Sequence, residues 1–257
     1  MLLAINANNT NTVFAVYDGP ALRGSWRAST DARRTADEYV VWLTQLMAFV
    51  GLTPGDIDGA ILSSVVPATV FNLKTLCRRY FSCDPLVVGE EECRLGIALA
   101  VDEPEAVGAD RILNTIAGRD RYSSPLVVVD LGTATTFDVV DAAGNYCGGP
   151  IAPGINLSLH ALEMAAAKLP HIALERPRRV IGRSTVECMQ SGLYWGYVGL
   201  MEGLVARIRA EFGAPMGVVA TGGLAPLFAG STPVIEHVDP DLALWGLYLI
   251  HRLNARP

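Results

Sequence analysis

The stretch INANNTNTV at residues 5–13 is matched by VDLGTATTF at residues 129–137. Each copy has an apolar strand, a polar or acidic residue at its end, a turn rich in Thr, Asn or Gly, and a second apolar strand. One copy alone would be interpreted as an ordinary hairpin with a polar turn. Two copies in matching context indicate a duplicated supersecondary unit, and therefore a chain built from two related α/β halves.

The residue types in both turns suit an anionic ligand such as a phosphate group. Small residues let backbone N–H groups approach an anion closely, and Thr or Asn side chains donate further hydrogen bonds. An acidic residue at the end of the first strand, as at Asp130, can hold a hydrated Mg²⁺ or a monovalent cation. The repeat therefore predicts two phosphate-binding turns.

Strand-like and helix-like segments alternate along the rest of the chain, without a low-complexity segment or flexible linker. Apolar runs bounded by turn residues predict strands at Leu2–Ile5, Thr12–Tyr17, Leu22–Trp26, Ala60–Val65, Leu86–Val88, Leu126–Val129, Thr136–Val140 and Met216–Ala220. Periodicity, capping boxes (Thr35 with Glu38, Ser184 with Glu187) and glycine stops predict helices through Tyr39–Val50, Pro67–Tyr80, Ala109–Arg121, from after Gly154 to about Leu169, Ser184–Phe212 and Leu242–Leu253. We expect halves at residues 1–118 and 119–257 that pack directly on each other.

Composition narrows the class of protein. The 257 residues are 51% hydrophobic and 18% charged, which is typical of a compact globular chain. A net charge of −6 argues against a nucleic-acid partner, and no apolar run is long enough to cross a bilayer. The N-terminus reads as a strand and not as a signal peptide, and five cysteines without CxxC spacing suit reduced thiols. We expect a cytoplasmic protein without a zinc site.

Three further motifs are GADR at residues 108–111, DLGTATT at 130–136, and GGPIAPG at 148–154 with AKLP following at 167–170. With these motifs, essentially the whole chain resembles the type III pantothenate kinases of the acetate/sugar kinase–Hsp70–actin superfamily. The resemblance implies two ribonuclease H-like halves with mixed sheets flanked by helices, holding ATP in the cleft between them. Thr221-Gly222-Gly223 is similar to the adenosine motif of that superfamily.

The resemblance also implies a reaction and its cofactors. Members of this family transfer the γ-phosphate of ATP to the primary hydroxyl of pantothenate, which gives 4'-phosphopantothenate on the route to coenzyme A. They are homodimers, and they use Mg²⁺ together with a monovalent cation, K⁺ or NH₄⁺. The expected partners of this chain are therefore pantothenate, ATP and a second copy of itself.

Residue roles follow from the same resemblance. Asp110 is the expected general base, Arg111 helps to hold the substrate, and Asp130 is the expected monovalent-cation ligand. The substrate site is expected at Val101, Gly108, Ala109, Asp110, Arg111 and Thr185, and the ATP site at Asn6, Ala7, Asn8, Asn9, Thr10, Asn11, Thr12, Val13, Thr133, Gly222 and Gly223. Taken alone, the Asp110–Arg111 pair could be a structural salt bridge, and Thr185 could serve only the start of a helix.

The first phosphate motif departs from the family pattern Asp-x-Gly-Asn-Thr, because Asn6 and Asn8 replace its aspartate and glycine. Asparagine accepts left-handed backbone conformations, so we expect Asn8 to be tolerated. The neutral amide of Asn6 lacks the charge that attracts Mg²⁺, so nucleotide–metal affinity or turnover should fall. Val101 is a second departure, since many members have tyrosine there.

Three functional hypotheses remain. The first is a working pantothenate kinase that tolerates Asn6, favoured by the retained motifs around Asp110 and Asp130. The second is a catalytically inactive, pantothenate-kinase-like protein that binds a ligand or acts as a regulator, favoured by the altered metal position. The third is a kinase of the same fold that acts on another small hydroxyl compound.

A stripe of glycines marks the long predicted helix. Gly192, Gly196, Gly199 and Gly203 are spaced by 4, 3 and 4 residues and so share one helix face. Each mid-helix glycine costs about 0.5–1 kcal/mol relative to alanine, so the stripe predicts a close helix–helix approach. The approach could be made to a dimer partner or to a buried neighbour in the same chain.

Overall fold

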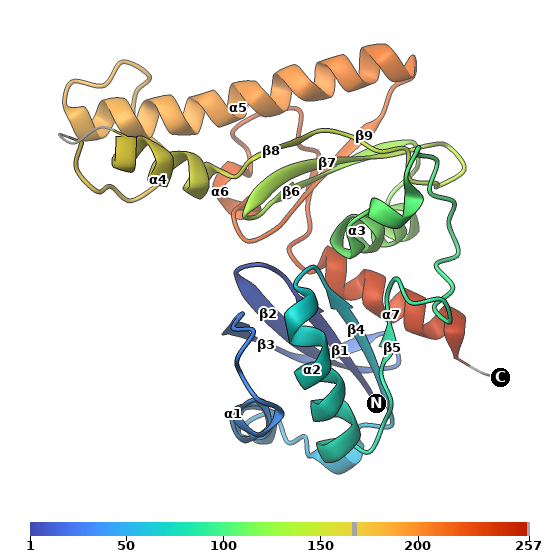
Figure 1. Cartoon of the computed structure of the whole chain (residues 1–257). Helices are drawn as coiled ribbons and strands as arrows, with labels where there is room; N and C mark the ends of the chain where they lie inside the picture. Colours follow the sequence, from blue (N-terminus) through green and yellow to red (C-terminus); the bar gives the residue numbers. More distant parts are fainter. Residues whose placement is uncertain (166–168, 256–257) are drawn as a thin grey trace. The chain divides into compact units, whose positions relative to one another are not determined.

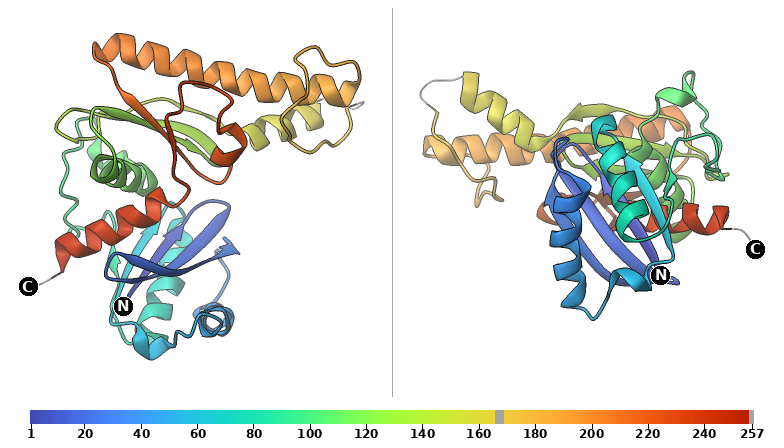
Figure 2. Two further views of the ribbon diagram at one scale, coloured as in Figure 1. Left: turned by 180° about the vertical axis from the view of Figure 1, so that it is seen from behind. Right: turned by 60° about the horizontal axis from the view of Figure 1, so that its bottom comes forward.

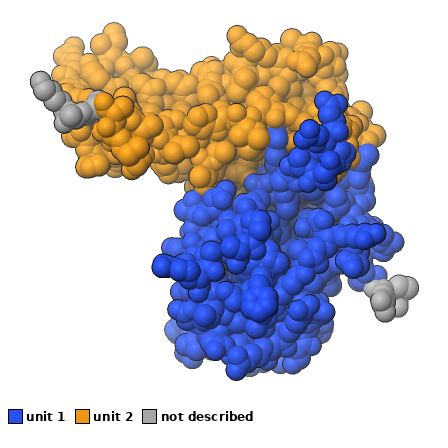
Figure 3. Space-filling view, in the orientation of Figure 1, with its two compact units in different colours: residues 1–98, 102–117, 242–257 blue, residues 99–101, 118–241 orange. Residues whose placement is uncertain are grey.

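The computed structural model describes residues 1–165 and 169–255 (Figure 1). Contacts between Cα atoms divide the chain into two compact units, which Figure 3 distinguishes by colour. Unit 1 holds residues 1–98, 102–117 and 242–257, and unit 2 holds residues 99–101 and 118–241. These units differ from the predicted halves chiefly because the C-terminal segment belongs to the first unit.

Each unit contains one five-stranded mixed sheet, and the two sheets have the same topology. The strand orders are β3-β2-β1-β4-β5 and β8-β7-β6-β9-β10. In each, the first three strands along the chain pair antiparallel, and the last two pair parallel. The strands are β1 (Leu2–Ala7), β2 (Asn11–Asp18), β3 (Ala21–Ser29), β4 (Gly59–Ser64), β5 (Leu86–Val87), β6 (Leu126–Leu131), β7 (Ala134–Val140), β8 (Ile151–Pro153), β9 (Gly217–Thr221) and β10 (His237–Val238). The predicted duplication and fold class are confirmed.

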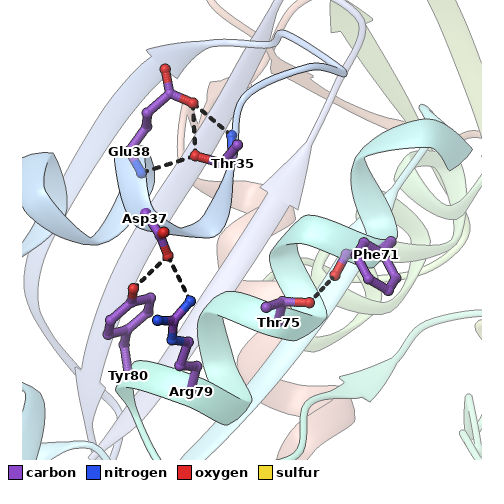
Figure 4. A network of polar contacts seen from close by, with 7 residues as sticks. All are labelled: Thr35, Asp37, Glu38, Phe71, Thr75, Arg79 and Tyr80. Carbon is purple, nitrogen blue, oxygen red and sulfur yellow. Dashed lines mark hydrogen bonds and ion pairs between the residues drawn. The ribbon is translucent and has the colours of Figure 1, made fainter.

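In unit 1, α1 (Ala36–Ala48) and α2 (Pro67–Tyr80) cover one face of the sheet (Figure 2). Their apolar sides meet the alternate β1 residues Leu3 and Ile5 in one core. Thr35 and Glu38 form the predicted reciprocal capping box at the start of α1 (Figure 4). The same helix is tied to α2 by Asp37, which accepts hydrogen bonds from Arg79 and Tyr80 (Figure 4).

The last helix, α7 (Leu242–Asn254), packs on β1 and β4 of unit 1. The rings of Trp245 and Tyr248 make tilted contacts with Tyr17 of β2, at centroid distances of 6.4 and 5.3 Å, and Tyr17 points away from the α1–α2 core. At Gly246, an added Cβ would lie 2.5 Å from the Leu113 carbonyl oxygen of α3 (Ala109–Arg121). Together with the packing on β1 and β4, this backbone contact explains why the C-terminal helix belongs to unit 1.

In unit 2, α5 (Thr185–Phe212) packs its buried side chains on one face of the sheet. α4 (Ile155–Ala165) lies against α5, and the one-turn α6 (Ala225–Phe228) follows β9. On the opposite face, Gly118 of α3 approaches side chains of β6: an added Cβ would meet Val128 at 3.0 Å and Leu126 at 3.1 Å. The boundary between the units falls within α3.

Most predicted elements are present, with three differences. β8, β10 and α6 were not expected, because two to four residues are too few to show a period. The helix predicted to reach about Leu169 ends at Ala165; residues 166–168, which include part of the AKLP motif, lie outside the described residues, and Leu169 is not helical. Glu187 does not complete a box with Ser184, because its carboxylate accepts the Arg183 N–H instead.

The glycine stripe on α5 faces open space in this chain. A Cβ added to Gly192, Gly196 or Gly199 would meet no atom within 4 Å, and at Gly203 it would meet only the Arg207 side chain, at 3.2 Å. A buried neighbour in the described part of the chain is therefore not the reason for these glycines. Within residues 1–165 and 169–255, no helix combines the length and apolar character of a membrane span.

Candidate active site

The first turn joins β1 to β2 at the carboxyl end of β1. Ala7 is opposite Thr12, which leaves residues 8–11 to reverse the chain. The Asn8 N–H donates to the Asn11 carbonyl at 3.0 Å and closes the turn. Asn9, Thr10 and Asn11 are exposed, so the turn presents its backbone and amide side chains to solvent.

The second turn occupies the equivalent place between β6 and β7, but it is one residue shorter. Leu131 is opposite Thr135, and the Gly132 N–H donates to the Ala134 carbonyl at 3.0 Å. The gap-free match of residues 5–13 with 129–137 is therefore wrong beyond the turn. Phe14, opposite Ile5, is the structural counterpart of Phe137, opposite Val129, and both rings are fully buried.

Asn8 is accommodated for a reason other than the expected one. Among the described residues, Ser82 is the one non-glycine with a positive φ, so Asn8 is not left-handed. Its counterpart Gly132 also lacks a positive φ, and a Cβ there would lie 3.5 Å from Asp130 Oδ1 and 3.6 Å from the Ala134 oxygen. These are ordinary contact distances. The turn accepts a side chain at this position without backbone strain.

Asn6 lies one residue before the turn and is 4% exposed. Its neighbour across the parallel β1–β4 pair is Ser63, which is fully buried. Asn6 Oδ1 and Ser63 Oγ both lack a hydrogen-bond partner among the described residues. A buried polar atom without a hydrogen-bond partner costs about 1–3 kcal/mol of stability. Two such atoms at the end of a strand therefore favour the binding of a polar ligand or water molecule that can form hydrogen bonds with them.

The chemistry of Asn6 and Ser63 shows whether unit 1 suits a divalent ion. Mg²⁺ is usually held by one or two carboxylates together with phosphate oxygens. Asn6 and Ser63 offer neutral oxygens only, and the described residues contain no group of three or more His, Cys, Asp or Glu side chains placed to hold a metal. The position fits a hydrated ion through hydrogen bonds to its water ligands, and it does not fit direct charge-driven coordination.

The GADR motif forms the start of α3. The Arg111 N–H donates to Asp110 Oδ1 at 2.9 Å, which fixes the orientation of the carboxylate and leaves its second oxygen outside this bond. A Cβ on Gly108 would lie 2.6 Å from the same Oδ1. Gly108 therefore leaves room for the carboxylate of Asp110 in this orientation.

In unit 2, the TGG segment lies directly beside the second turn. Asp130 is opposite Thr221 in the parallel β6–β9 pair. Gly222 has a φ of +90°, and a Cβ there would lie 2.5 Å from Asp130 Oδ1 and 2.8 Å from the backbone of Leu131. Only glycine fits at position 222, because a side chain would collide with Asp130 and Leu131 of the same chain. Gly223 is exposed with open space at its Cβ.

The predicted residues are divided between the two units. Unit 1 contains the turn after Asn6 and, as a separate segment, the Gly108–Arg111 motif at the start of α3. Unit 2 brings together Asp130, Thr133 of the turn, and the two glycines after β9. Val101 lies in unit 2, where its Cγ1 would be 3.4 Å from a Cβ on Gly148. Thr185 is exposed in the first turn of α5.

Ser63 is the site residue that the motifs did not reveal. It interrupts the apolar strand Ala60–Val65 at its carboxyl end, as Asn6 interrupts the first strand. A polar residue that ends a buried parallel strand is a usable signal, since such ends meet at the edge where α/β folds bind ligands.

Comparison with known proteins connects this geometry to a family. The family model described as type III pantothenate kinase matches residues 2–207. The chain belongs to the type III pantothenate kinase family. Proteins named type III pantothenate kinase from Paramagnetospirillum magneticum and Rhodospirillum rubrum are 66% and 63% identical to it; the first alignment covers 100% of this chain and 99% of its relative, the second 99% of each.

A solved structure supports the fold. The inorganic polyphosphate/ATP-glucomannokinase from Arthrobacter sp. strain KM superposes with a TM-score of 0.51 at 14% identity, over 99% of both chains. Membership of the type III pantothenate kinase family makes this chain a kinase, an enzyme that transfers a phosphoryl group. The expected fold class and family are confirmed.

Replacing Asn6 with aspartate tests the metal position without an activity assay. In Asn6→Asp, a carboxylate would be buried beside Ser63 without a partner, so its pKa should rise above the usual 3.9. A raised pKa means that the penalty is absent below about pH 3.9 and grows as the pH rises above it. At pH 7 we expect the variant to be less stable than wild type by about 1–3 kcal/mol in EDTA, and to recover with Mg²⁺.

Urea unfolding at pH 7, with and without Mg²⁺, measures this effect. Asn9→Asp is the matched control, because Asn9 is exposed in the same turn and its charge would be solvated. Wild type and the control should respond little to Mg²⁺. Equal stability of Asn6→Asp and wild type in EDTA would contradict a buried, unpartnered position.

Proposed function

We propose that this protein phosphorylates pantothenate on its primary hydroxyl with ATP, giving 4'-phosphopantothenate. The observation that carries the proposal is the pair of exposed turns after β1 and β6, in a chain 66% identical to a protein named for this activity. Each turn presents backbone N–H groups to phosphate oxygens of ATP. The segment at Gly222 and Gly223 receives the adenosine.

Asp110 acts as the general base in this proposal. Its Oδ1 is held by the Arg111 N–H at the start of α3, and the space left by Gly108 keeps the carboxylate in one orientation. A fixed carboxylate takes the hydroxyl proton as the pantothenate oxygen attacks the γ-phosphorus, while the bond from that phosphorus to the β,γ-bridging oxygen breaks. The guanidinium of Arg111 holds an anionic or carbonyl group of pantothenate, together with Val101, Ala109 and Thr185.

Cations complete the proposed site. Asp130 is the carboxylate for a monovalent cation, K⁺ or NH₄⁺, at the end of β6. Mg²⁺, when bound, neutralises charge on the transferring phosphoryl group and is held mainly by the nucleotide phosphates. Asn6 Oδ1 and Ser63 Oγ would accept hydrogen bonds from its water ligands, which makes unit 1 a weak contributor to metal affinity. All five cysteines are free thiols, which supports the proposal that the protein works in the reducing cytoplasm.

Activity measurements test the reaction and the role of Asp110 together. Wild type should convert pantothenate and ATP to phosphopantothenate in Mg²⁺ and K⁺, and Asp110→Asn should lose about 10²–10⁴-fold in kcat because the base is gone. The double variant Asn6→Asp, Asn8→Gly should turn over faster than wild type. A coupled ADP-release assay, checked by mass spectrometry of the product, measures all three proteins.

The same assay decides between the hypotheses. An inactive wild type with an active double variant would identify a catalytically inactive relative and contradict the proposal. Turnover with a different hydroxyl compound, and none with pantothenate, would identify another kinase of this fold.

We further propose that the protein is a homodimer whose contact includes the glycine stripe of α5. Gly192, Gly196 and Gly199 are exposed, and a Cβ added to any of them would meet no atom of the described residues within 4 Å. Together the three glycines weaken the helix by about 1.5–3 kcal/mol. A second copy of the helix packed along this face would give the stripe a physical reason. Glycines at such spacing let two helix backbones approach closely.

Gly196→Gln tests the dimer. The longer side chain should hold the helices apart, so the variant should sediment as a monomer at micromolar concentration where wild type sediments as a dimer. Glu211→Gln is the matched control, because Glu211 is exposed on the same helix but does not lie on the face of the glycine stripe. Sedimentation velocity measures both variants. A dimeric Gly196→Gln protein would contradict the proposed contact.

A further inference from the structure

The two phosphate turns are held by residues at equivalent places in the repeat. Thr30 follows the last residue of β3, and its N–H donates to the Thr10 carbonyl of the first turn at 3.0 Å. Gly154 follows the last residue of β8, and its N–H donates to the Thr133 carbonyl of the second turn at 3.0 Å. Because β3 and β8 occupy the same position in the two sheets, both units use one device.

In the first turn, the Thr30 side chain adds a second bond. Its hydroxyl donates to the Asn8 carbonyl at 2.6 Å and lies 2.9 Å from the Thr12 hydroxyl. A hydroxyl has one proton, so the Thr12 hydroxyl is the donor in the second contact. Thr12 is fully buried, and Thr30 is thus its hydrogen-bond acceptor as well as the clamp on the turn.

In the second turn, the contact depends on the absence of a side chain. A Cβ on Gly154 would lie 2.2 Å from the Thr133 oxygen and 2.5 Å from the Gly132 oxygen. The carbonyl of the preceding residue, Pro153, accepts a hydrogen bond from the Tyr197 hydroxyl of α5, which holds the end of β8 in place. Burial raises the pKa of this phenol.

Fixing a carbonyl determines where the next N–H points. The peptide unit is planar and trans, so its C=O and the following N–H point in opposite directions. Holding the Asn8 and Thr10 carbonyls towards Thr30 turns the N–H groups of Asn9 and Asn11 the other way. Holding the Thr133 carbonyl towards Gly154 does the same for the N–H of Ala134.

We propose that Thr30 and Gly154 are positioning residues that aim backbone N–H groups of the two turns at the phosphate groups of ATP. This proposal rests on the proposed function for the identity of the anion, and on the hydrogen bonds from Thr30 and Gly154 to the turn carbonyls for the direction of the N–H groups. Neither residue touches the nucleotide. Each acts through the turn carbonyl that it holds.

Thr30→Val and Thr30→Ser separate the hydroxyl from the shape of the side chain. Valine removes the bond to Asn8 and leaves the Thr12 hydroxyl without its acceptor, whereas serine keeps both. We expect Thr30→Val to weaken binding of a non-hydrolysable ATP analogue on the order of tenfold, and Thr30→Ser to stay within about twofold of wild type. Amide hydrogen exchange in residues 8–11 should be faster in the valine variant only.

Two further variants complete the design. Thr75→Val is the matched control, because Thr75 makes the same hydroxyl-to-carbonyl bond, to Phe71 at 2.8 Å, but on α2 (Figure 4). It should leave both readouts unchanged. Gly154→Ala acts on the second turn and should weaken analogue binding and speed exchange near residues 132–134, so the inference stays testable if Thr30→Val does not fold.

Calorimetric titration of the analogue and exchange measured by mass spectrometry decide the outcome. Wild-type affinity in both Thr30→Val and Gly154→Ala would overturn the inference. If wild type itself binds no analogue, the proposed function fails, and the exchange data decide alone: faster exchange in the variant turns supports the positioning role, and unchanged exchange overturns it.

Discussion

Both halves of this protein depend on one constraint, the fixed opposition of C=O and N–H within a planar peptide. A turn that must offer N–H groups to an anion needs its carbonyls bound on the far side. In each unit, the residue after the third strand meets this need with one backbone N–H, from Thr30 or from Gly154. In the proposed site, the third strand of each unit therefore acts through the residue that follows it.

Two glycines stand where segments of the chain approach each other closely. Gly222 brings the segment after β9 against Asp130 and Leu131, and Gly108 leaves space for the Asp110 carboxylate. In both places an added Cβ would collide with an atom of the site at 2.6 Å or less. These glycines hold protein groups together, and close approach of a ligand is not required to explain them.

Charge distinguishes the two halves. Unit 2 keeps Asp130 at the end of β6, whereas unit 1 has Asn6 at the end of β1. The amide preserves packing, since Asn6 is buried in the strand position of an aspartate, but it provides no charge for a cation. In the proposed phosphoryl transfer, catalysis rests on positioning and on charge compensation, and the change to Asn6 concerns charge compensation. Asn8, by contrast, has no steric or backbone consequence.

The fold class could be predicted from the sequence, because the repeated motif and the alternation of strand-like and helix-like segments both indicate two related α/β halves. The sequence could not place α7, because the apolar pattern of a helix does not show which sheet the helix packs on; the contacts of α7 with β1 and β4, and of Gly246 with Leu113, are visible only in the structure. The one-residue difference in length between the turns could not be predicted, because the two Thr-rich sequences align equally well without a gap. The strand register shows that Phe14 and Phe137 are the equivalent residues. The role of Thr30 could not be predicted from the sequence. Thr30 binds backbone carbonyls, and every residue has a carbonyl, so the residue types give no sign of these contacts.

The most direct measurement is a crystal structure with a non-hydrolysable ATP analogue and Mg²⁺. The account predicts phosphate oxygens within hydrogen-bond distance of N–H groups in both turns, at residues 8–11 and 132–134, and no metal–oxygen bond to Asn6. An analogue whose phosphates contact neither turn, or a Mg²⁺ coordinated directly by Asn6 Oδ1, would contradict it.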